Sequence, residues 1–197
     1  MKANASLVWA VIVMVCFSAM NNAAAQEKSE IKHSNVGLKL NLGLGSQHFT
    51  QAQELEEDGA AALSLGYGVS QRVTLWLGAQ AGEFQHVGNQ QFTSDWVGLQ
   101  FDVQYKLQPG QKFRPYGKIG LGTAFLGDNQ SEIVLNGDGV TWALGAEYRL
   151  ARFLSVGAEF YWKDFEYRQQ QVGDDFQDLP RALEGDTRGF MLNFTLH

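Results

Sequence analysis

Strict alternation between apolar residues and small or polar residues is the feature that most constrains the fold of this chain. In the first such stretch the apolar residues are Val36, Leu38, Leu40, Leu42 and Leu44, and the residues between them are Gly37, Lys39, Asn41 and Gly43. Seven further stretches with the same two-residue period follow, and the last ends at Leu196. Successive side chains of a β-strand point to opposite faces, so this period is typical of strands with one apolar face. The sequence therefore predicts eight β-strands.

The first 25 residues have the features of an export signal. A positively charged start precedes an apolar stretch at 7–19, and three alanines at 23–25 supply the small residues that signal peptidase requires. We therefore expect the mature chain to be a single domain of residues 26–197. The apolar stretch is shorter than the roughly 20 residues of a spanning helix. Cys16 lies inside the signal, so we expect no thiol, disulfide or lipid anchor in the mature protein.

The lengths of the connections indicate how the strands are arranged. We place strands near residues 35–49, 60–69, 72–84, 94–107, 113–126, 139–150, 154–165 and 187–197. Short connections alternate with long ones, and the predicted long loops lie near 50–59, 85–93, 127–138 and 166–186. Short turns on one rim and long loops on the other are typical of outer-membrane barrels. We predict an all-β fold, an eight-stranded antiparallel up-and-down transmembrane β-barrel in the outer membrane of a Gram-negative cell.

A soluble barrel is the alternative interpretation of the same alternation. In a lipocalin-like barrel the apolar set would line an internal ligand cavity and the polar set would face water. Three features favour the membrane barrel: strands longer than the roughly 9–11 residues that cross a bilayer, small residues in the intervening set, and asymmetric loops. Small residues suit a narrow interior better than a solvated exterior.

The chain resembles the small outer-membrane barrel superfamily typified by the transmembrane domain of outer membrane protein A and by outer membrane protein X. The resemblance covers nearly all of the mature chain and rests on architecture. Its best local element is the alternating last strand at 189–197, which is similar to the C-terminal assembly signal of such proteins. His197 departs from the aromatic residue at which the family usually ends. The resemblance implies that the outer-membrane assembly machinery is a partner.

Charged side chains of both signs fall on the face opposite to the apolar set. These predicted interior residues are Lys39, Arg72, Gln80, Asp102, Lys106, Arg114, Lys118, Glu147, Arg149, Glu159 and Lys163. If Leu107 lies opposite Phe113, Asp102 lies across from Lys118, and Lys106 faces Arg114. We interpret the set as a structural salt-bridged network that fills an eight-stranded lumen. A narrow solute or ion pore is the functional alternative.

Aromatic residues of the apolar set fall near the strand ends. They are Trp142 and Trp162 toward the long loops, and Tyr67, Tyr105 and Tyr148 toward the short turns. Aromatic girdles at both interfaces are common in outer-membrane barrels. We interpret these residues as a girdle, and a sugar-binding platform is the alternative.

The predicted long loops are acidic. Their carboxylates are Glu54, Glu56, Glu57, Asp58, Asp128, Glu132, Asp138, Asp174, Asp175, Asp178, Glu184 and Asp186, and Arg168, Arg181 and Arg188 offset them. A solvated, repulsive surface is the default interpretation. Divalent cations that bridge carboxylates to lipopolysaccharide are the alternative. The net charge of −6 argues against nucleic acid as a partner.

The four mature histidines, His33, His48, His86 and His197, show no close metal-ligand spacing. His48 and His86 could approach each other near the loop rim, but zinc needs three or four ligands. No His-x-Ser motif lies in a strand, so the sequence does not indicate a lipid A-modifying enzyme. We therefore expect solitary exposed histidines, no cofactor, no metal and no catalytic residue.

Together these features predict a non-catalytic, monomeric outer-membrane protein with a structural or surface-interaction role in the cell envelope. Its expected partners are outer-membrane lipids and lipopolysaccharide. A pore, a lipid A-modifying enzyme and a soluble periplasmic ligand-binding barrel are the alternatives, in that order.

Overall fold

Nine β-strands make up the part of the chain that the structure describes. The structure is a computed structural model, and it describes residues 35–49, 55–56, 58–86, 89–128, 133–173 and 175–197. The strands are β1 (Gly37–Phe49), β2 (Leu55–Glu56), β3 (Asp58–Gly68), β4 (Val73–His86), β5 (Asn89–Lys106), β6 (Phe113–Asp128), β7 (Ile133–Arg149), β8 (Leu154–Val172) and β9 (Asp175–Leu196). The predicted export signal lies outside the described residues.

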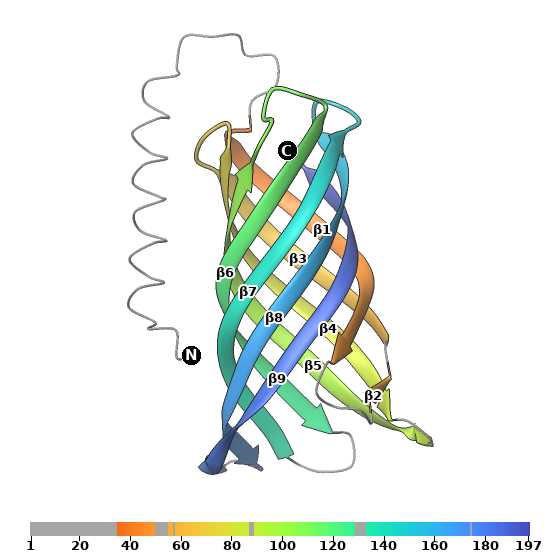
Figure 1. Cartoon of the computed structure of the whole chain (residues 1–197), viewed down its shortest axis with the longest axis vertical. Coiled ribbons are helices and arrows are strands. Elements are labelled where there is room, and N and C mark those ends of the chain that lie inside the picture. Colours follow the sequence, from red (N-terminus) through yellow and green to blue (C-terminus); the bar gives the residue numbers. More distant parts are fainter. Residues whose placement is uncertain (1–34, 50–54, 57, 87–88, 129–132, 174) are drawn as a thin grey trace.

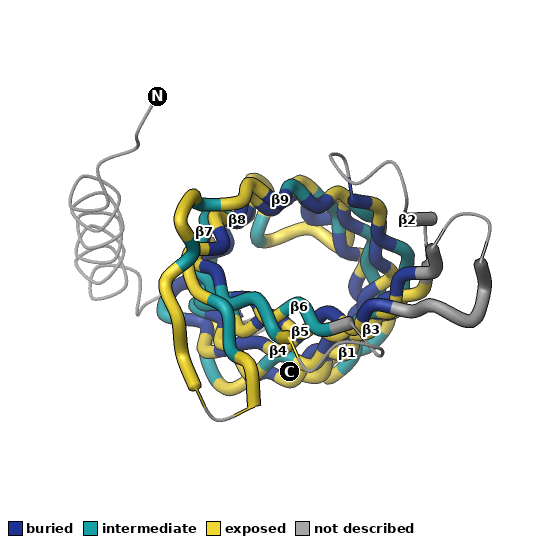
Figure 2. The backbone as a smooth tube through the Cα atoms, turned by 90° about the horizontal axis from the view of Figure 1, so that it is seen from below, coloured by how far each residue is buried: buried dark blue, intermediate teal, exposed yellow. Residues whose placement is uncertain are grey.

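The eight long strands form a closed ring (Figure 1, Figure 2). Neighbours along the chain pair antiparallel, and β1 pairs with β9 in a register that sets Leu40 opposite Leu196. The two-residue β2 pairs with β4 outside this ring. A closed ring leaves no strand edge unpaired. The predicted eight-stranded up-and-down barrel is confirmed.

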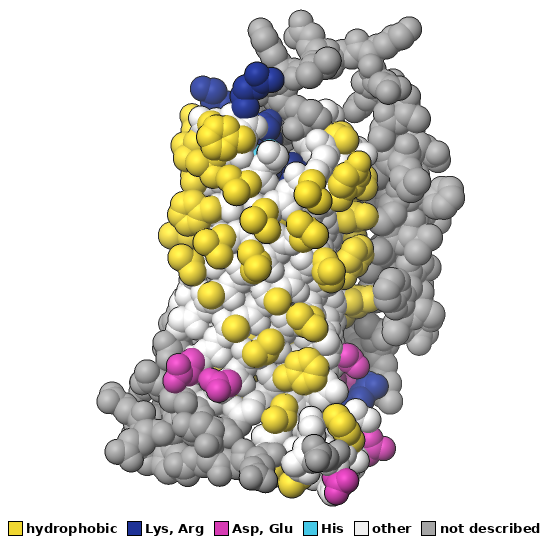
Figure 3. Space-filling model, turned by 180° about the vertical axis from the view of Figure 1, so that it is seen from behind, with side chains coloured by type: hydrophobic (Ala, Val, Ile, Leu, Met, Phe, Trp, Pro, Cys, Tyr) yellow, Lys and Arg dark blue, Asp and Glu magenta, His cyan; other side chains and the backbone are white. Residues whose placement is uncertain are grey.

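The apolar set faces outward. In β1, Leu38 is 66% exposed, whereas its neighbour Lys39 is 3% exposed, and the other strands repeat this pattern (Figure 2). Figure 3 shows apolar side chains along one face of the barrel wall, with basic residues at one end and mainly acidic residues at the other. Apolar residues outside and polar residues inside are the reverse of a soluble barrel. No helix in the described ranges is long and apolar enough to cross a membrane.

Glycines on the inward face make room for large aromatic side chains. Gly66 lies opposite Trp76 in the pairing of β3 and β4, and a Cβ on Gly66 would collide with the indole of Trp76. A Cβ on Gly98 would likewise collide with the ring of Trp96. The small residues of the alternating pattern therefore accommodate bulky neighbours inside a narrow barrel.

Strands continue into the regions that the sequence predicts as long loops. Most of 166–186 is strand, because β8 runs to Val172 and β9 begins at Asp175. Only short breaks separate β4 from β5 and β6 from β7, and much of 50–59 lies outside the described residues. Beyond the membrane both faces of a hairpin meet water, so the apolar period ends there while backbone pairing continues. Alternation therefore underestimates the length of these strands.

Candidate functional site

Polar side chains fill the end of the lumen next to the short turns, which is the periplasmic end of such barrels. The carboxylate of Glu147 lies 2.6 Å from Lys106 Nζ and 2.9 Å from Arg114 Nε. Lys106 also donates to Asn35 Oδ1 over 2.7 Å. Lys106 and Arg114 are fully buried and Glu147 is 5% exposed. Two of the predicted interior cations, Lys106 and Arg114, thus share one carboxylate.

A second ionic layer lies farther along the lumen. Lys118 Nζ pairs with Glu159 Oε2 at 2.7 Å, and the Tyr116 hydroxyl donates to the same oxygen over 2.9 Å. Asp102 accepts hydrogen bonds from Thr141 Oγ1 at 2.6 Å and from Gln100 Nε2 at 3.0 Å. These contacts join β5, β6, β7 and β8 across the interior, so this layer ties the walls of the barrel together.

The register of β5 and β6 differs from the predicted one. Asp102 lies opposite Gly120, and Lys106 lies opposite Tyr116. The turn is therefore shifted by two residues, and Leu107 donates its backbone N–H to the carbonyl of Pro115. A shift of two keeps each side chain on its predicted face. The predicted direct pairs of Asp102 with Lys118 and of Lys106 with Arg114 are wrong.

Arg72 is the exception among the predicted interior residues. It lies in the turn before β4, is exposed, and donates to the hydroxyl of Tyr105 over 2.9 Å. Alternation assigns a face only within a strand, and β4 begins at Val73. The prediction that Arg72 lies inside the barrel is therefore wrong.

Lys163 occupies the outer part of the lumen. Its ammonium donates to Gln80 Oε1 and to Gln100 Oε1, each over 2.7 Å. It also lies 4.8 Å from the centroid of the Trp96 ring and 5.2 Å from that of Tyr161. Amide oxygens and ring faces can stabilise a cation in place of a carboxylate. This layer joins the ionic layers to the aromatic residues above it.

Aromatic side chains close the outer end of the lumen. The cluster contains Phe49, Phe84, Trp96, Phe165 and Tyr167, all at most 4% exposed, with Ala124 among them. Trp96 Nε1 donates to the Tyr167 hydroxyl over 3.2 Å. The sequence analysis missed this cluster because it treated the inward face as polar throughout. The alternation itself contained the signal. Trp96 is an even number of residues from Gly98 and Asp102 in the same strand, so its side chain points to the same inward face.

Ser155 and His197 form a contact that the sequence analysis did not foresee. Ser155 Oγ lies 2.8 Å from His197 Nε2, and Lys39 Nζ lies 2.6 Å from His197 Nδ1. The expectation of an exposed, solitary histidine is wrong for His197.

The group that contacts the far nitrogen of His197 decides what this serine–histidine pair can do chemically. A hydrolytic triad needs a carboxylate on the far imidazole nitrogen, which leaves the near nitrogen free to accept the serine proton. Here Lys39 Nζ, and not a carboxylate, contacts Nδ1. If Lys39 is charged and the imidazole is neutral, the ring proton is assigned to Nε2. Arg114 Nη2 also donates to Ser155 Oγ, over 2.9 Å. In this tautomer Ser155 Oγ accepts hydrogen bonds from both His197 and Arg114, and no carboxylate among the described residues completes a triad.

The predicted girdle residues lie on the outer wall. Trp142 and Trp162 are cross-strand partners on β7 and β8 and are 48% and 37% exposed. Tyr67, Tyr105 and Tyr148 are also exposed. The next outward-facing pair beyond Trp162 is Asp164 and Asp186. The outer boundary of the apolar wall therefore lies between the Trp142–Trp162 pair and the Asp164–Asp186 pair.

Beyond this boundary, β8 and β9 continue as a long hairpin. Its register jumps between Tyr167 and Gln169, because Tyr167 pairs with Leu183 whereas Gln169 pairs with Asp178. The four residues 179–182 bulge out of the ladder, and Pro180 lies among them. Proline lacks an N–H group and is tolerated at bulges. Leu179 packs against the aromatic cluster, so the bulge contacts the outer end of the lumen.

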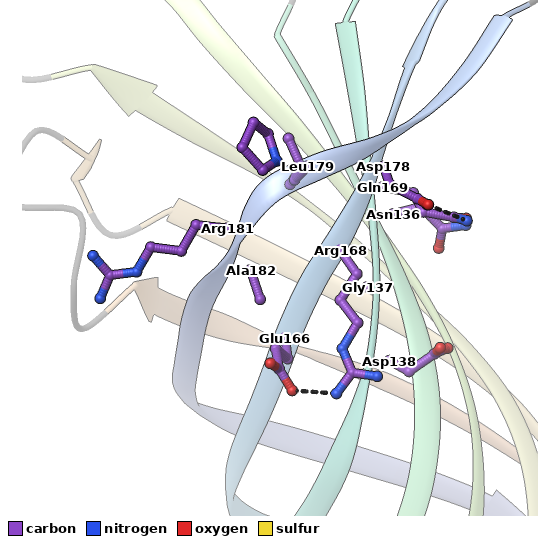
Figure 4. Close-up of a pocket in the computed structure, with 11 residues that line it drawn as sticks. Asn136, Gly137, Asp138, Glu166, Arg168, Gln169, Asp178, Leu179, Arg181 and Ala182 are labelled. Carbon is purple, nitrogen blue, oxygen red and sulfur yellow. Dashed lines mark hydrogen bonds and ion pairs between the residues drawn. The ribbon is translucent and has the colours of Figure 1, made fainter.

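A polar hollow of about 510 Å³ lies beside this bulge (Figure 4). Arg168 Nη2 pairs with Glu166 Oε2 at 2.6 Å, and Gln169 Nε2 donates to Asp178 Oδ1 over 3.1 Å. The other lining residues are Asn136, Gly137, Asp138, Leu179, Pro180, Arg181 and Ala182. The lining combines donors, acceptors and charges of both signs, a composition that suits a polar or sugar-like ligand.

Carboxylates face one another across the same hairpin. Asp164 lies opposite Asp186, and Glu166 lies opposite Glu184 and Asp138 on its two sides. Like charges directly opposite each other destabilise a sheet. Among the described residues no group of three His, Cys, Asp or Glu side chains could hold a metal ion. The alternative of divalent-cation bridging gains no support from the described carboxylates.

Comparison with known proteins adds to this geometry. The outer membrane protein beta-barrel domain family matches residues 9–195. The chain belongs to this family. The resemblance to small outer-membrane barrels is thereby confirmed, and the protein is located in the cell outer membrane. No curated protein sequence shows significant similarity to the chain.

Solved structures of small outer-membrane barrels share the fold. Neisserial surface protein A is 8% identical, with a TM-score of 0.58 over 81% of this chain and 96% of the other. OprG from Pseudomonas aeruginosa is 14% identical, with a TM-score of 0.59 over 85% and 98%. AlkL, solved by solid-state NMR in lipid bilayers, is 12% identical, with a TM-score of 0.51 over 87% and 94%. At these identities the likeness concerns the fold alone.

Proposed function

We propose that this family member is a non-catalytic, monomeric element of the outer membrane that combines a closed barrel with an outward interaction surface. One observation carries the proposal: in the described residues, ionic layers and a buried aromatic cluster occupy the lumen, while β8 and β9 extend past the girdle. Ion pairs occupy the lower layers, and buried aromatic rings occupy the outer layer. A filled eight-stranded barrel serves as an anchor, which leaves the extension to make contacts.

Lipopolysaccharide of the same membrane is the proposed partner of the extension. The polar hollow lies beyond Trp162, at the level where sugars and phosphates of the outer leaflet are found. Arg181 is exposed at its rim, and arginine is well suited to bind phosphate. The carboxylates and amides of the lining can bond sugar hydroxyls. The assembly machinery that inserts the barrel is the second proposed partner, through the strand at 189–197.

Non-catalytic character is supported by the chemistry of the one serine–histidine contact described above. The ammonium of Lys39 takes the position where a hydrolase has a carboxylate. Ser155 also accepts a bond from Arg114, so its hydroxyl is poorly placed to attack a substrate. Buried polar groups that bond one another are typical of structural networks.

Two measurements test the proposal. In planar bilayers the purified protein should carry no steady current, and a reproducible single-channel conductance would overturn the closed anchor. In nanodiscs, lipopolysaccharide should raise the thermal unfolding midpoint above its value in phospholipid. Arg181→Gln should reduce that rise, whereas Arg152→Gln, at the opposite rim, should leave it unchanged. An equal rise in both variants would refute binding at the hollow.

A further inference from the structure

The periplasmic layer of the lumen holds more buried positive charge than its carboxylate can balance. Lys39, Lys106, Arg114 and Arg149 are 3%, 0%, 0% and 8% exposed. In the described part of this layer, only Glu147 forms ion pairs with them. Lys39 lies within electrostatic range of Lys106, Arg114 and Arg149. Buried charges are costly unless they are paired, so this excess needs a counter-charge.

Contacts within the protein use only part of the donors in this layer. Lys106 is bonded to Glu147 and Asn35, and Lys39 is bonded to His197. Arg114 uses Nη2 on Ser155 and faces Glu147 with Nε. Arg149 uses Nη2 on the backbone carbonyl of Arg152 over 2.9 Å.

Three guanidinium nitrogens have neither a hydrogen-bond partner nor an ion-pair contact among the described residues. They are Arg114 Nη1, Arg149 Nε and Arg149 Nη1, and all three are buried. A buried donor without a partner carries the full cost of its desolvation. Guanidinium groups present rigid forks of N–H donors that match oxyanions. Guanidinium donors without partners and an excess of positive charge therefore occur in the same layer.

The backbone register brings the two arginines together. Arg114 lies opposite Glu147 in the pairing of β6 and β7, and Arg149 is the next inward residue of β7 after Glu147. Arg149 lies opposite Ser155, the residue to which Arg114 donates. The cluster adjoins the turn between β7 and β8, at the end of the barrel where the strand β1 begins (Figure 1). An ion would enter from the periplasmic side.

We propose that Arg114 and Arg149 hold one small inorganic anion in the periplasmic mouth of the barrel. The anion supplies the missing counter-charge to the four cations and accepts hydrogen bonds from the unused guanidinium nitrogens. Phosphate is the favoured ligand because its several oxygens can accept hydrogen bonds from both arginines at once, and chloride is its smaller competitor. This inference does not depend on the proposed contact with lipopolysaccharide.

A titration of thermal unfolding tests the site. The protein from outer membranes is held in a maltoside detergent, which has no phosphate group, and phosphate is added while gluconate keeps the ionic strength constant. We expect the unfolding midpoint to rise along a saturating curve. Arg149→Gln should remove the saturable rise, and Arg149→Lys should raise the half-saturating concentration at least tenfold. Arg72→Gln removes an exposed charge from the same rim and should keep the full response.

The outcomes separate specific binding from general effects of salt. An unfolding midpoint that does not change with phosphate at constant ionic strength would overturn the proposal. A saturable rise that persists in Arg149→Gln would overturn it as well. An equal loss of response in Arg72→Gln would reduce the effect to screening. If the unfolding midpoint rises with vesicles of phosphate-headgroup lipid but not with inorganic phosphate, the ligand is a lipid and the proposed free anion is refuted. Retained heat-modifiable gel mobility shows that each variant is folded.

Discussion

Trp96 on β5 donates its indole N–H to the hydroxyl of Tyr167 on β8 over 3.2 Å, across the outer end of the lumen. The Trp96 ring is fully buried, and its edge packs against Phe165 with 6.0 Å between ring centroids. Below it lies the ammonium of Lys163. The Trp96 side chain therefore links the aromatic cluster at the outer end to the polar residues of the lumen.

Substitution of Trp96 should destabilise the barrel without opening it. Trp96→Ala removes a large buried ring and should cost about 3–5 kcal/mol of unfolding free energy, measured by reversible denaturation in detergent. Tyr167→Phe loses a single hydrogen bond and should cost about 1 kcal/mol. Neither variant should conduct, because the ionic layers still fill the lumen. A steady ion current through Trp96→Ala would contradict this account.

Much of this architecture can be predicted from the alternation of apolar and polar residues alone. Alternation fixes which residues face lipid, and it places Lys106, Glu147 and Lys118 inside because each lies within a regular strand. Partner choice is not encoded in the same way. A two-residue slip in the β5–β6 turn preserves every face yet replaces the predicted Asp102–Lys118 pair with the contact from Thr141.

Other features depend on contacts between residues distant in sequence. His197 meets Lys39 across the β1–β9 seam, and no local motif signals that contact. The β8–β9 hairpin lacks alternation because water covers both of its faces, so its strand character is lost from the apolar pattern. The bulge at 179–182 arises from a register jump that only the paired strands reveal.

Glu147 should be far more important for stability than exposed carboxylates. Glu147→Gln removes the ion-pair partner of both Lys106 and Arg114 and leaves buried charges uncompensated, so we expect a loss of about 3–5 kcal/mol. Glu166→Gln breaks the exposed pair with Arg168 and should have little measurable effect. Equilibrium unfolding of both variants in the same detergent checks this. Equal losses would show that the Glu147 network is not a main source of stability.

Gly66 should resist even the smallest side chain. A Cβ at this position would collide with the Trp76 indole, and that ring is held by a 2.9 Å hydrogen bond from Nε1 to Gln104 Oε1. Gly66→Ala should therefore cost about 1–3 kcal/mol, the usual range for an overpacked core. Gly59→Ala is the matched control, because a Cβ there meets nothing within 4 Å. Refolding yields and unfolding midpoints compare the two, and similar values would contradict the packing argument.

The facing carboxylates of Asp164 and Asp186 should make stability depend on pH. Both lie one outward position beyond Trp162, outside the membrane-spanning segment. Partial burial, and then the neighbouring Asp164, raises the pKa of Asp186 above its usual value. A raised folded-state pKa means that this group favours the folded state at acidic pH. That contribution is fully present below the unfolded pKa of about 3.9 and is lost as pH rises through the folded value.

Asp186→Asn should therefore stabilise the protein at neutral pH. Removing one of two like charges should gain about 0.2–1 kcal/mol near pH 7, and the gain should vanish near pH 3, where wild-type Asp186 is already protonated. Asp175→Asn is the control, because Asp175 lies opposite Val172 and faces no carboxylate in that pair. Unfolding midpoints measured from pH 3 to pH 8 decide the question. A gain that is independent of pH would show that the carboxylates do not repel each other across β8 and β9.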